Sequence, residues 1–224
     1  DGREFFQSLF SPGQFVEASK DTGEAFAGVD FAAQIGTVAG LYNTTATDVH
    51  VTMQKRNGRL VALDGKGTLN GSAPATVRLE QSGGSRLIKV DSADAGSAFR
   101  LAGFYPSVEG GNAQLQVNLD AGAKGSISGT LWAHDFTVKG DSVVGDVLSD
   151  PNSEAVLGER KQQRTAGTRI AFSQLRAPFT VGGGKFRLRD AYMNGPQLGA
   201  TMRGTVDFKS DTVELGGTYI PLYG

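Results

Sequence analysis

The sequence KFRLRDAYMNGPQLGATMRGTVDFKSDTVELGGTY, residues 185–219, decides the fold because apolar and polar side chains alternate through three successive runs. A period of two places neighbouring side chains on opposite faces of an extended strand. Gly195-Pro196 separates the first two runs, and Asp211 lies in the turn before the third. We therefore predict antiparallel strands with one buried face over Gly184–Met193, Gln197–Phe208 and Thr212–Pro221.

The same alternation recurs towards the N-terminus, back to residue 26. The segment 47–69 reads as a hairpin, with Val49, Val51 and Met53 on one side of its first strand. Asn57-Gly58 supplies a turn that favours positive φ. Further strands are predicted at Ala75–Glu80, Ser85–Val90, Ala113–Leu119, Gly129–Lys139 and Arg169–Val181.

Three stretches depart from this alternation of apolar and polar residues. A helix is predicted from Ser92 to Tyr105, with Ser92 as its N-cap and with Phe99 and Ala102 on its apolar side, because apolar residues there recur every three or four positions. A shorter helix is predicted over Asp141–Leu148. The polar segment 151–168 has neither period over most of its length, and we expect a mobile loop there.

Composition agrees with a β protein but leaves its shape open. Glycine takes 32 of 224 positions, and there are 13 Phe and one Trp, so turns are abundant and one face of the sheet is broadly apolar. A barrel, a sandwich and an open elongated sheet all satisfy this periodicity. The chain begins at Asp1 without a methionine. We treat residues 1–224 as a single domain cut from a longer protein.

Charge and residue content argue against several functions. The 22 Lys and Arg nearly balance the 23 Asp and Glu, so no field of one sign exists to attract nucleic acid. Cysteine is absent, which removes disulfides, thiolate metal sites and cysteine nucleophiles. The sequence has no apolar run of the 18 or more residues that a membrane-spanning helix requires.

The two histidines of the sequence give little indication of a catalytic site. His50 alternates with Val49 and Val51 on a predicted strand, where a surface position is the simplest reading. His134 and Asp135 are neighbours on another strand and point to opposite faces, so they do not form a base and its orienting carboxylate. We predict no catalytic residue, metal ion or cofactor, and hence that the protein is not an enzyme.

One charged run leaves two readings open. Lys185, Arg187 and Arg189 alternate with Phe186 and Leu188. A strand with one solvated face is the first interpretation, and a face that contacts phosphate is the second.

Two segments, 91–119 and 168–224, resemble the AsmA-like C-terminal domain. The first contains Asp94-Ala95-Gly96 at a helix start, followed by Gly110-Gly111 as a turn before a strand. The second contains further matching elements in the same order: an Ile-x-Phe-x-x-Leu strand at Ile170, Phe172 and Leu175, the Gly195-Pro196 turn, Gly204, Val206 and Asp207, and Gly217 to Pro221. The resemblance covers residues 90–224 well. Residues 24–90 resemble the family only in their general strand pattern.

The resemblance implies both a fold and a function. It implies an open, elongated, twisted antiparallel sheet, shaped like a folded taco, with one or two short helices on its apolar face. It also implies a segment of a bridge-like protein that is anchored in the inner membrane of a diderm bacterium and crosses the periplasm. Such a protein carries phospholipids to the outer membrane and supports the integrity of that membrane, with partner proteins at each membrane that remain unnamed. The alternative is a closed β-sandwich that serves as a binding or adhesion module of the cell envelope.

A lipid conduit needs a continuous apolar wall, because each acyl CH₂ exposed to water costs roughly 0.8 kcal/mol. The candidate wall consists of alternate strand residues: Leu115, Val117, Leu119, Phe186, Leu188, Met202, Val206, Phe208, Val213, Leu215 and Tyr219. Phe99 and Ala102 are the residues expected to pack the helix on it.

Overall fold

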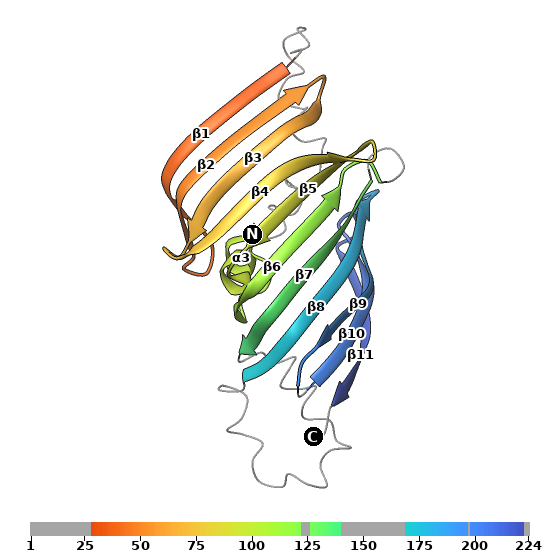
Figure 1. The fold of residues 1–224 in the computed structure, drawn as a ribbon. Coiled ribbons are helices and arrows are strands. Elements are labelled where there is room, and N and C mark those ends of the chain that lie inside the picture. Colours follow the sequence, from red (N-terminus) through yellow and green to blue (C-terminus); the bar gives the residue numbers. More distant parts are fainter. Residues whose placement is uncertain (1–27, 122–125, 140–168, 197, 222–224) are drawn as a thin grey trace, which may run out of the picture.

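A computed structural model describes residues 28–121, 126–139, 169–196 and 198–221 of the chain (Figure 1). The helix predicted over Asp141–Leu148 and the loop predicted at 151–168 lie outside the described residues. Among the described residues, no helix is long and apolar enough to cross a membrane.

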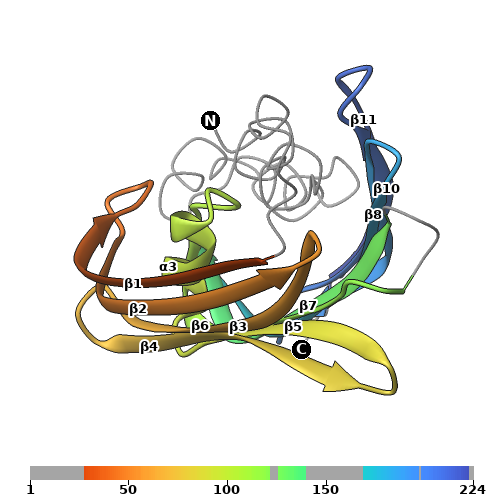
Figure 2. The same cartoon turned by 90° about the horizontal axis from the view of Figure 1, so that it is seen from above.

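The chain is mainly β and forms one open antiparallel sheet of eleven strands, with one short helix. Each strand pairs with its neighbours in chain order. Figure 2 shows the sheet bent into a trough, with the helix on its concave side and the C-terminal strands rising beside it. The strands are β1 (Gly28–Ala39), β2 (Thr45–Arg56), β3 (Arg59–Leu69), β4 (Ala73–Ser82), β5 (Ser85–Ser92), β6 (Val108–Asn118), β7 (Ile127–Lys139), β8 (Arg169–Gly182), β9 (Lys185–Asn194), β10 (Leu198–Asp207) and β11 (Thr212–Pro221).

The open sheet confirms the predicted fold class, and most strand boundaries lie close to the predicted ones. β11 matches its prediction to the residue. The Asn57-Gly58 turn also forms as predicted, with φ of 51° and 73°. Gly110-Gly111 is a correction, because these residues lie inside β6, which begins at Val108, and form no turn before it. β1 had no predicted boundaries of its own.

The helix α3 spans Ala95–Leu101 and is shorter than predicted. Its N-cap is Asp94, whose carboxylate accepts a hydrogen bond from the Ser97 backbone N–H at 3.1 Å. Ser92, the predicted cap, ends β5, and its hydroxyl binds the backbone of Asp94. Asp caps as well as Ser does, so the motif predicts a helix start here but not which of the two residues caps it.

The adjacent strands β6 and β7 share a local distortion at Gly111 and Asp135, here called the crease. Gly111 of β6 and Asp135 of β7 both take left-handed φ values, of 73° and 54°. As a result Ala133 and Phe136, three residues apart, are both buried on the face that carries α3. A side chain at Gly111 would meet the His134 carbonyl oxygen at 2.5 Å, so only glycine fits there.

The core lies on this same face and has two parts. One surrounds α3 and brings Phe99 of the helix against strands β6 to β8 and β10, with Phe136 and Phe172 stacked at 5.4 Å between ring centroids. The other centres on Val117 and Phe179, farther along β6 and β8. The helix therefore packs on the apolar face of the sheet, and it serves as a second layer over the central strands.

Candidate functional site

The candidate site is the face of the sheet that carries α3, here called the inner face. Cross-strand pairs define its rows: Ile35 lies opposite Val49, Val51 opposite Gly65, and Val77 opposite Val90. Alternate residues of every strand from β1 to β11 belong to these rows. Most of them are apolar: Val29, Phe31, Ala33, Ile35, Val49, Val51, Met53, Leu63, Ala75, Val77, Leu79, Ile88, Val90, Ala113, Leu115, Val117, Ile127, Leu131, Ala133, Leu175, Ala177, Phe179, Val181, Phe186, Leu188, Ala191, Met193, Ala200, Met202, Val206, Val213 and Leu215.

Burial along the inner face falls from the centre to both flanks. Val117 on β6 is 3 % exposed, whereas Phe31 on β1 is 47 % exposed and Leu215 on β11 is 57 % exposed. Exposed large apolar side chains that line up on adjacent strands are unusual on a soluble surface and mark binding sites. The flanks of the inner face are therefore the part of the described chain that is available to an apolar ligand.

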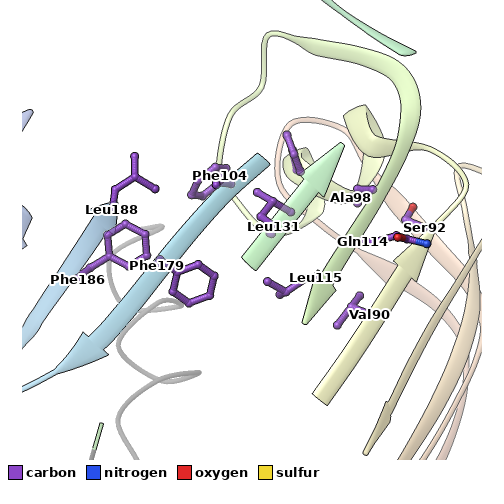
Figure 3. A pocket seen from close by; sticks show the side chains of 14 residues that line it. Val90, Ser92, Ala98, Phe104, Gln114, Leu115, Leu131, Phe179, Phe186 and Leu188 are labelled. Atoms are coloured by element: carbon purple, nitrogen blue, oxygen red, sulfur yellow. The ribbon is translucent and has the colours of Figure 1, made fainter. Parts of the chain in front are cut away.

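A cavity of about 190 Å³ lies between α3 and the C-terminal strands (Figure 3). Phe179, Phe186 and Leu188 lie on one side of it, and Phe104 and Leu131 face them. Apart from Ser92 and Gln114, every residue that lines the cavity is apolar. An apolar cavity of this kind holds hydrocarbon in preference to water.

Buried polar groups hold α3 in place beside this cavity. The Ser97 hydroxyl is fully buried and accepts hydrogen bonds from Asn70 Nδ2 at 2.8 Å and from Arg100 Nη2 at 3.2 Å, while it contacts the Asp94 carboxylate. Arg100 Nη1 also donates to the Val108 carbonyl at 2.7 Å. The Asn70 and Val108 contacts join the helix to the turn between β3 and β4 and to the start of β6, so the network fixes the helix on the sheet.

The opposite face, here called the outer face, is polar. Glu80 and Lys89 form a 2.6 Å ion pair on it, and Lys185 at the start of β9 forms one of 2.8 Å with Asp207 at the end of β10. The hydrogen bond from Lys185, helped by the Lys209 and Ser210 backbone N–H groups, lowers the pKa of Asp207 to about 2. The sheet thus presents charge on one side and hydrocarbon on the other.

Ionic contacts also lie along one edge of the inner face, where strands end. Arg86 holds Asp120 in a two-pronged contact, with Nη2–Oδ1 at 2.6 Å and Nε–Oδ2 at 2.9 Å, which keeps the pKa of Asp120 well below its usual range. Arg86 occupies an inner row at the end of β5, and Lys55 occupies one at the end of β2. The apolar rows therefore end in basic residues at this edge.

The predicted wall residues fall into three environments. Leu115, Val117, Leu119 and Phe186 belong to the second core cluster, and Leu188 lines the cavity. The remaining residues lie on the C-terminal strands: Met202, Val206, Val213 and Leu215 on inner rows, Tyr219 at the β11 position opposite Ala200, and Phe208 in the turn after β10.

The two residues predicted to pack the helix lie on its sheet side. Phe99 is 6 % exposed and belongs to the core, and Ala102 lines the cavity.

The predicted wall did not include the N-terminal half of the inner face, although Val49, Val51 and Met53 were placed together on one side of their strand. Val29, Phe31 and Ile35 of β1 extend the apolar rows by one strand, and the alternation in residues 29–35 was the signal for them. Phe104 and Phe179 were also missed as cavity residues. Phe104 belongs to no strand, and its edge-to-face contact with Phe99, at 5.7 Å, is a tertiary feature without a sequence signal.

The two histidines lie apart, on outer rows of β2 and β7. His50 lies opposite Lys66, and His134 lies opposite Gln174. Within the described ranges, no group of three or more His, Asp or Glu side chains is arranged to hold a metal ion. Comparison of the chain with protein-family models, with curated proteins and with solved structures finds no match.

Proposed function

We propose that the chain is a segment of a bridge-like lipid transport protein that resembles the AsmA-like family and carries phospholipids between the inner and outer membranes. In this proposal the full-length protein is anchored in the inner membrane of a diderm bacterium and spans the periplasm. The segment acts as a passive wall rather than as an enzyme, and the flow of phospholipid supports the outer membrane.

The observation that supports this proposal best is the apolar inner face, which continues across all eleven strands and stays accessible at both flanks. Phe31, Met202, Val213 and Leu215 are each more than two-fifths exposed. At roughly 25 cal/mol per Å² of apolar surface, covering such side chains with acyl chains is favourable for both partners. A folded chain that leaves these residues uncovered is poised to bind hydrocarbon.

The geometry of the sheet suits passage better than storage. The sheet is open, and its apolar rows run across the strands from β1 to β11, with α3 packed over the central strands and the flanks exposed. A wall of Leu, Val, Phe and Met offers no directional bond that would hold a chain at one position. Acyl chains therefore slide along it, while the phosphate headgroup stays in water at the open side.

A binding or adhesion module of the envelope is the second candidate. That reading expected a closed sandwich core, and the described strands instead form a single open sheet. An adhesion role would then depend on the exposed flanks as a protein contact, and such a contact would exclude lipid from the same side chains.

Mass spectrometry of lipids that co-purify with the natively expressed protein tests the proposal. We expect phospholipids in the wild type and in Thr201→Asp, which places the charge on the outer row. We expect them to be depleted at least about fivefold in Met202→Asp, because an ion on the inner row keeps its water and opposes an adjacent acyl chain. Circular dichroism of both variants controls for folding. Absence of phospholipid from the wild type, or equal retention by the two folded variants, contradicts the proposal.

A further inference from the structure

The outer face of the C-terminal strands carries a shallow hollow that the proposed function does not use. Three successive strands line it: residues Arg187, Leu188, Arg189 and Asp190 of β9, Arg203, Gly204 and Thr205 of β10, and Glu214, Leu215 and Gly216 of β11. Arg187, Thr205 and Glu214 form one row across the three strands, and Arg203 lies opposite Gly216. These pairings place the hollow on the side of the sheet away from the apolar rows.

The three arginines of the hollow are exposed and have no ion pair or hydrogen bond within the described part of the chain. By contrast, Arg56, Arg86 and Arg169 each form an ion pair, with Asp30, Asp120 and Glu109 respectively. Like charges on neighbouring positions of a sheet repel and destabilise it. Three guanidinium groups around one hollow, beside two carboxylates that they do not contact, therefore indicate a site for an external anion.

The backbone brings the three guanidinium groups within reach of one ligand. Arg187 and Arg189 are two residues apart on β9, roughly 7 Å along the strand. Arg203 lies on the adjacent strand, where the pairing of β9 with β10 shifts register around Asp190, which has a φ of 44°. This bulge turns β9 locally and lets side chains from both strands converge.

Gly216 gives the ligand room. A Cβ built on it meets nothing within 4 Å, so the missing side chain leaves open space directly opposite Arg203. The Thr205 hydroxyl adds a hydrogen-bond donor in the row between Arg187 and Glu214. The site thus offers hydrogen-bond donors from β9 and β10 and open space beside Gly216.

We propose that this hollow binds a phosphate group, held by Arg187, Arg189 and Arg203. The planar guanidinium fork matches two phosphate oxygens at once, and a phosphate monoester carries about −1.5 to −2 charges at neutral pH. Three guanidinium groups exceed the two nearby carboxylates of Glu214 and Asp190 in number, so the hollow keeps a net positive charge that attracts an anion. The phosphate belongs to a soluble phosphate ester or to a phospholipid headgroup at a membrane surface.

A titration of the full chain with inorganic phosphate, followed by NMR of the arginine Nε–H groups and the Gly216 amide, tests the site. We expect both sets of signals to shift, and sodium acetate at equal ionic strength to leave them unchanged. Gly216→Glu fills the open space with an opposing charge and is expected to weaken phosphate binding at least about tenfold. Gly216→Gln, of the same size, is expected to stay within about threefold of the wild type.

Glu214→Gln supplies a gain of function that loss of folding does not imitate. Removing this carboxylate is expected to tighten phosphate binding at least about threefold. Absence of phosphate-dependent shifts, or equal weakening by Gly216→Glu and Gly216→Gln, overturns a specific soluble-phosphate site.

Vesicles of phosphatidylcholine with and without phosphatidic acid identify the source of the phosphate. Sedimentation with the acid-containing vesicles, lost in Gly216→Glu, assigns the phosphate to a headgroup, whereas shifts with phosphate alone and no sedimentation assign it to a soluble ester. Absence of both responses overturns the proposal. Because the hollow and the apolar rows lie on opposite faces, failure here leaves the proposed lipid wall intact.

Discussion

The centre and the flanks of the inner face share one sequence pattern but differ in what covers them. Phe172 on β8 and Phe31 on β1 both lie on the inner face, yet Phe172 is 1 % exposed and Phe31 is 47 % exposed. At the centre, α3 and the crease bring a second layer of side chains onto the sheet. The flanks have no such layer in the described part of the chain. Alternation therefore specifies an apolar face, and only the neighbouring elements decide whether that face is core or binding surface.

Truncating one phenylalanine in each region gives the largest contrast. Phe172→Ala removes a ring that stacks on Phe136 and leaves a cavity, so we expect a loss of about 3–5 kcal/mol in the free energy of unfolding. Phe31→Ala removes a half-exposed ring, and we expect a loss below about 1 kcal/mol. Urea denaturation of the three proteins measures both values. Similar losses at the two sites would show that the flank is as well packed as the centre.

A single methyl group added at Gly96 is expected to disturb the packing of α3 against the sheet. A Cβ on Gly96 would meet the Val108 carbonyl oxygen at 2.5 Å and Glu109 Cα at 2.9 Å, so Gly96→Ala must push the helix from the sheet. We expect a cost of about 1–3 kcal/mol. Gly36→Ala on β1, where a Cβ meets nothing within 4 Å, is the matched control and should change stability little. Equal effects of the two substitutions on thermal unfolding would contradict the tight docking of α3.

A charged substitution on the C-terminal flank of the inner face is expected to impair lipid transfer while changing the stability of the protein little. Leu215 is 57 % exposed, so in Leu215→Asp the carboxylate keeps most of its water, and we expect stability to change by less than about 1 kcal/mol. Transfer of fluorescent phospholipid between vesicles by the full-length protein should nevertheless fall at least about tenfold. Leu215→Ile should retain transfer. Normal transfer by a folded Leu215→Asp protein would argue against passage along β11.

The smallest expected effect concerns pH at the outer face. The Lys185 ion pair lowers the folded-state pKa of Asp207 to about 2, below an unfolded value near 3.9. A depressed folded pKa adds stability that is complete above about pH 4 and is lost as the pH falls towards 2. Asp207→Asn should flatten this part of the stability curve, measured by thermal melts from pH 5 to pH 2. An unchanged slope would show that the Asp207 pair adds no stability.

Much of the sheet could be predicted from local patterns, because strand periodicity and turn chemistry act over a few residues. Alternation placed β11 to the residue, and the Asn57-Gly58 turn followed from its need for positive φ. The crease could not be predicted in this way. Asp135 adopts a positive φ inside β7, which the strand pattern does not indicate, and the alternation between Ala133 and Phe136 shifts by one residue there.

The candidate site was predicted in its C-terminal half and missed elsewhere for a related reason. Met202 and Leu215 follow from alternation within single strands, whereas the cavity depends on Phe104, which folds back from the end of α3. Open and closed sheets share the same alternation, since curvature depends on twist and bulges summed over many strands. The exposure of Phe31 and Leu215 is thus a property of the whole sheet.

Photo-crosslinking in cells tests the central claim most directly. A crosslinking amino acid is placed in the full-length protein at Leu215, on the inner row, or at Thr218, on the outer row of β11 and outside the arginine hollow. If acyl chains pass along the inner face, phospholipid adducts form at position 215 and not at position 218. Absence of adducts at both positions in folded protein, or equal adducts at both, would contradict the account.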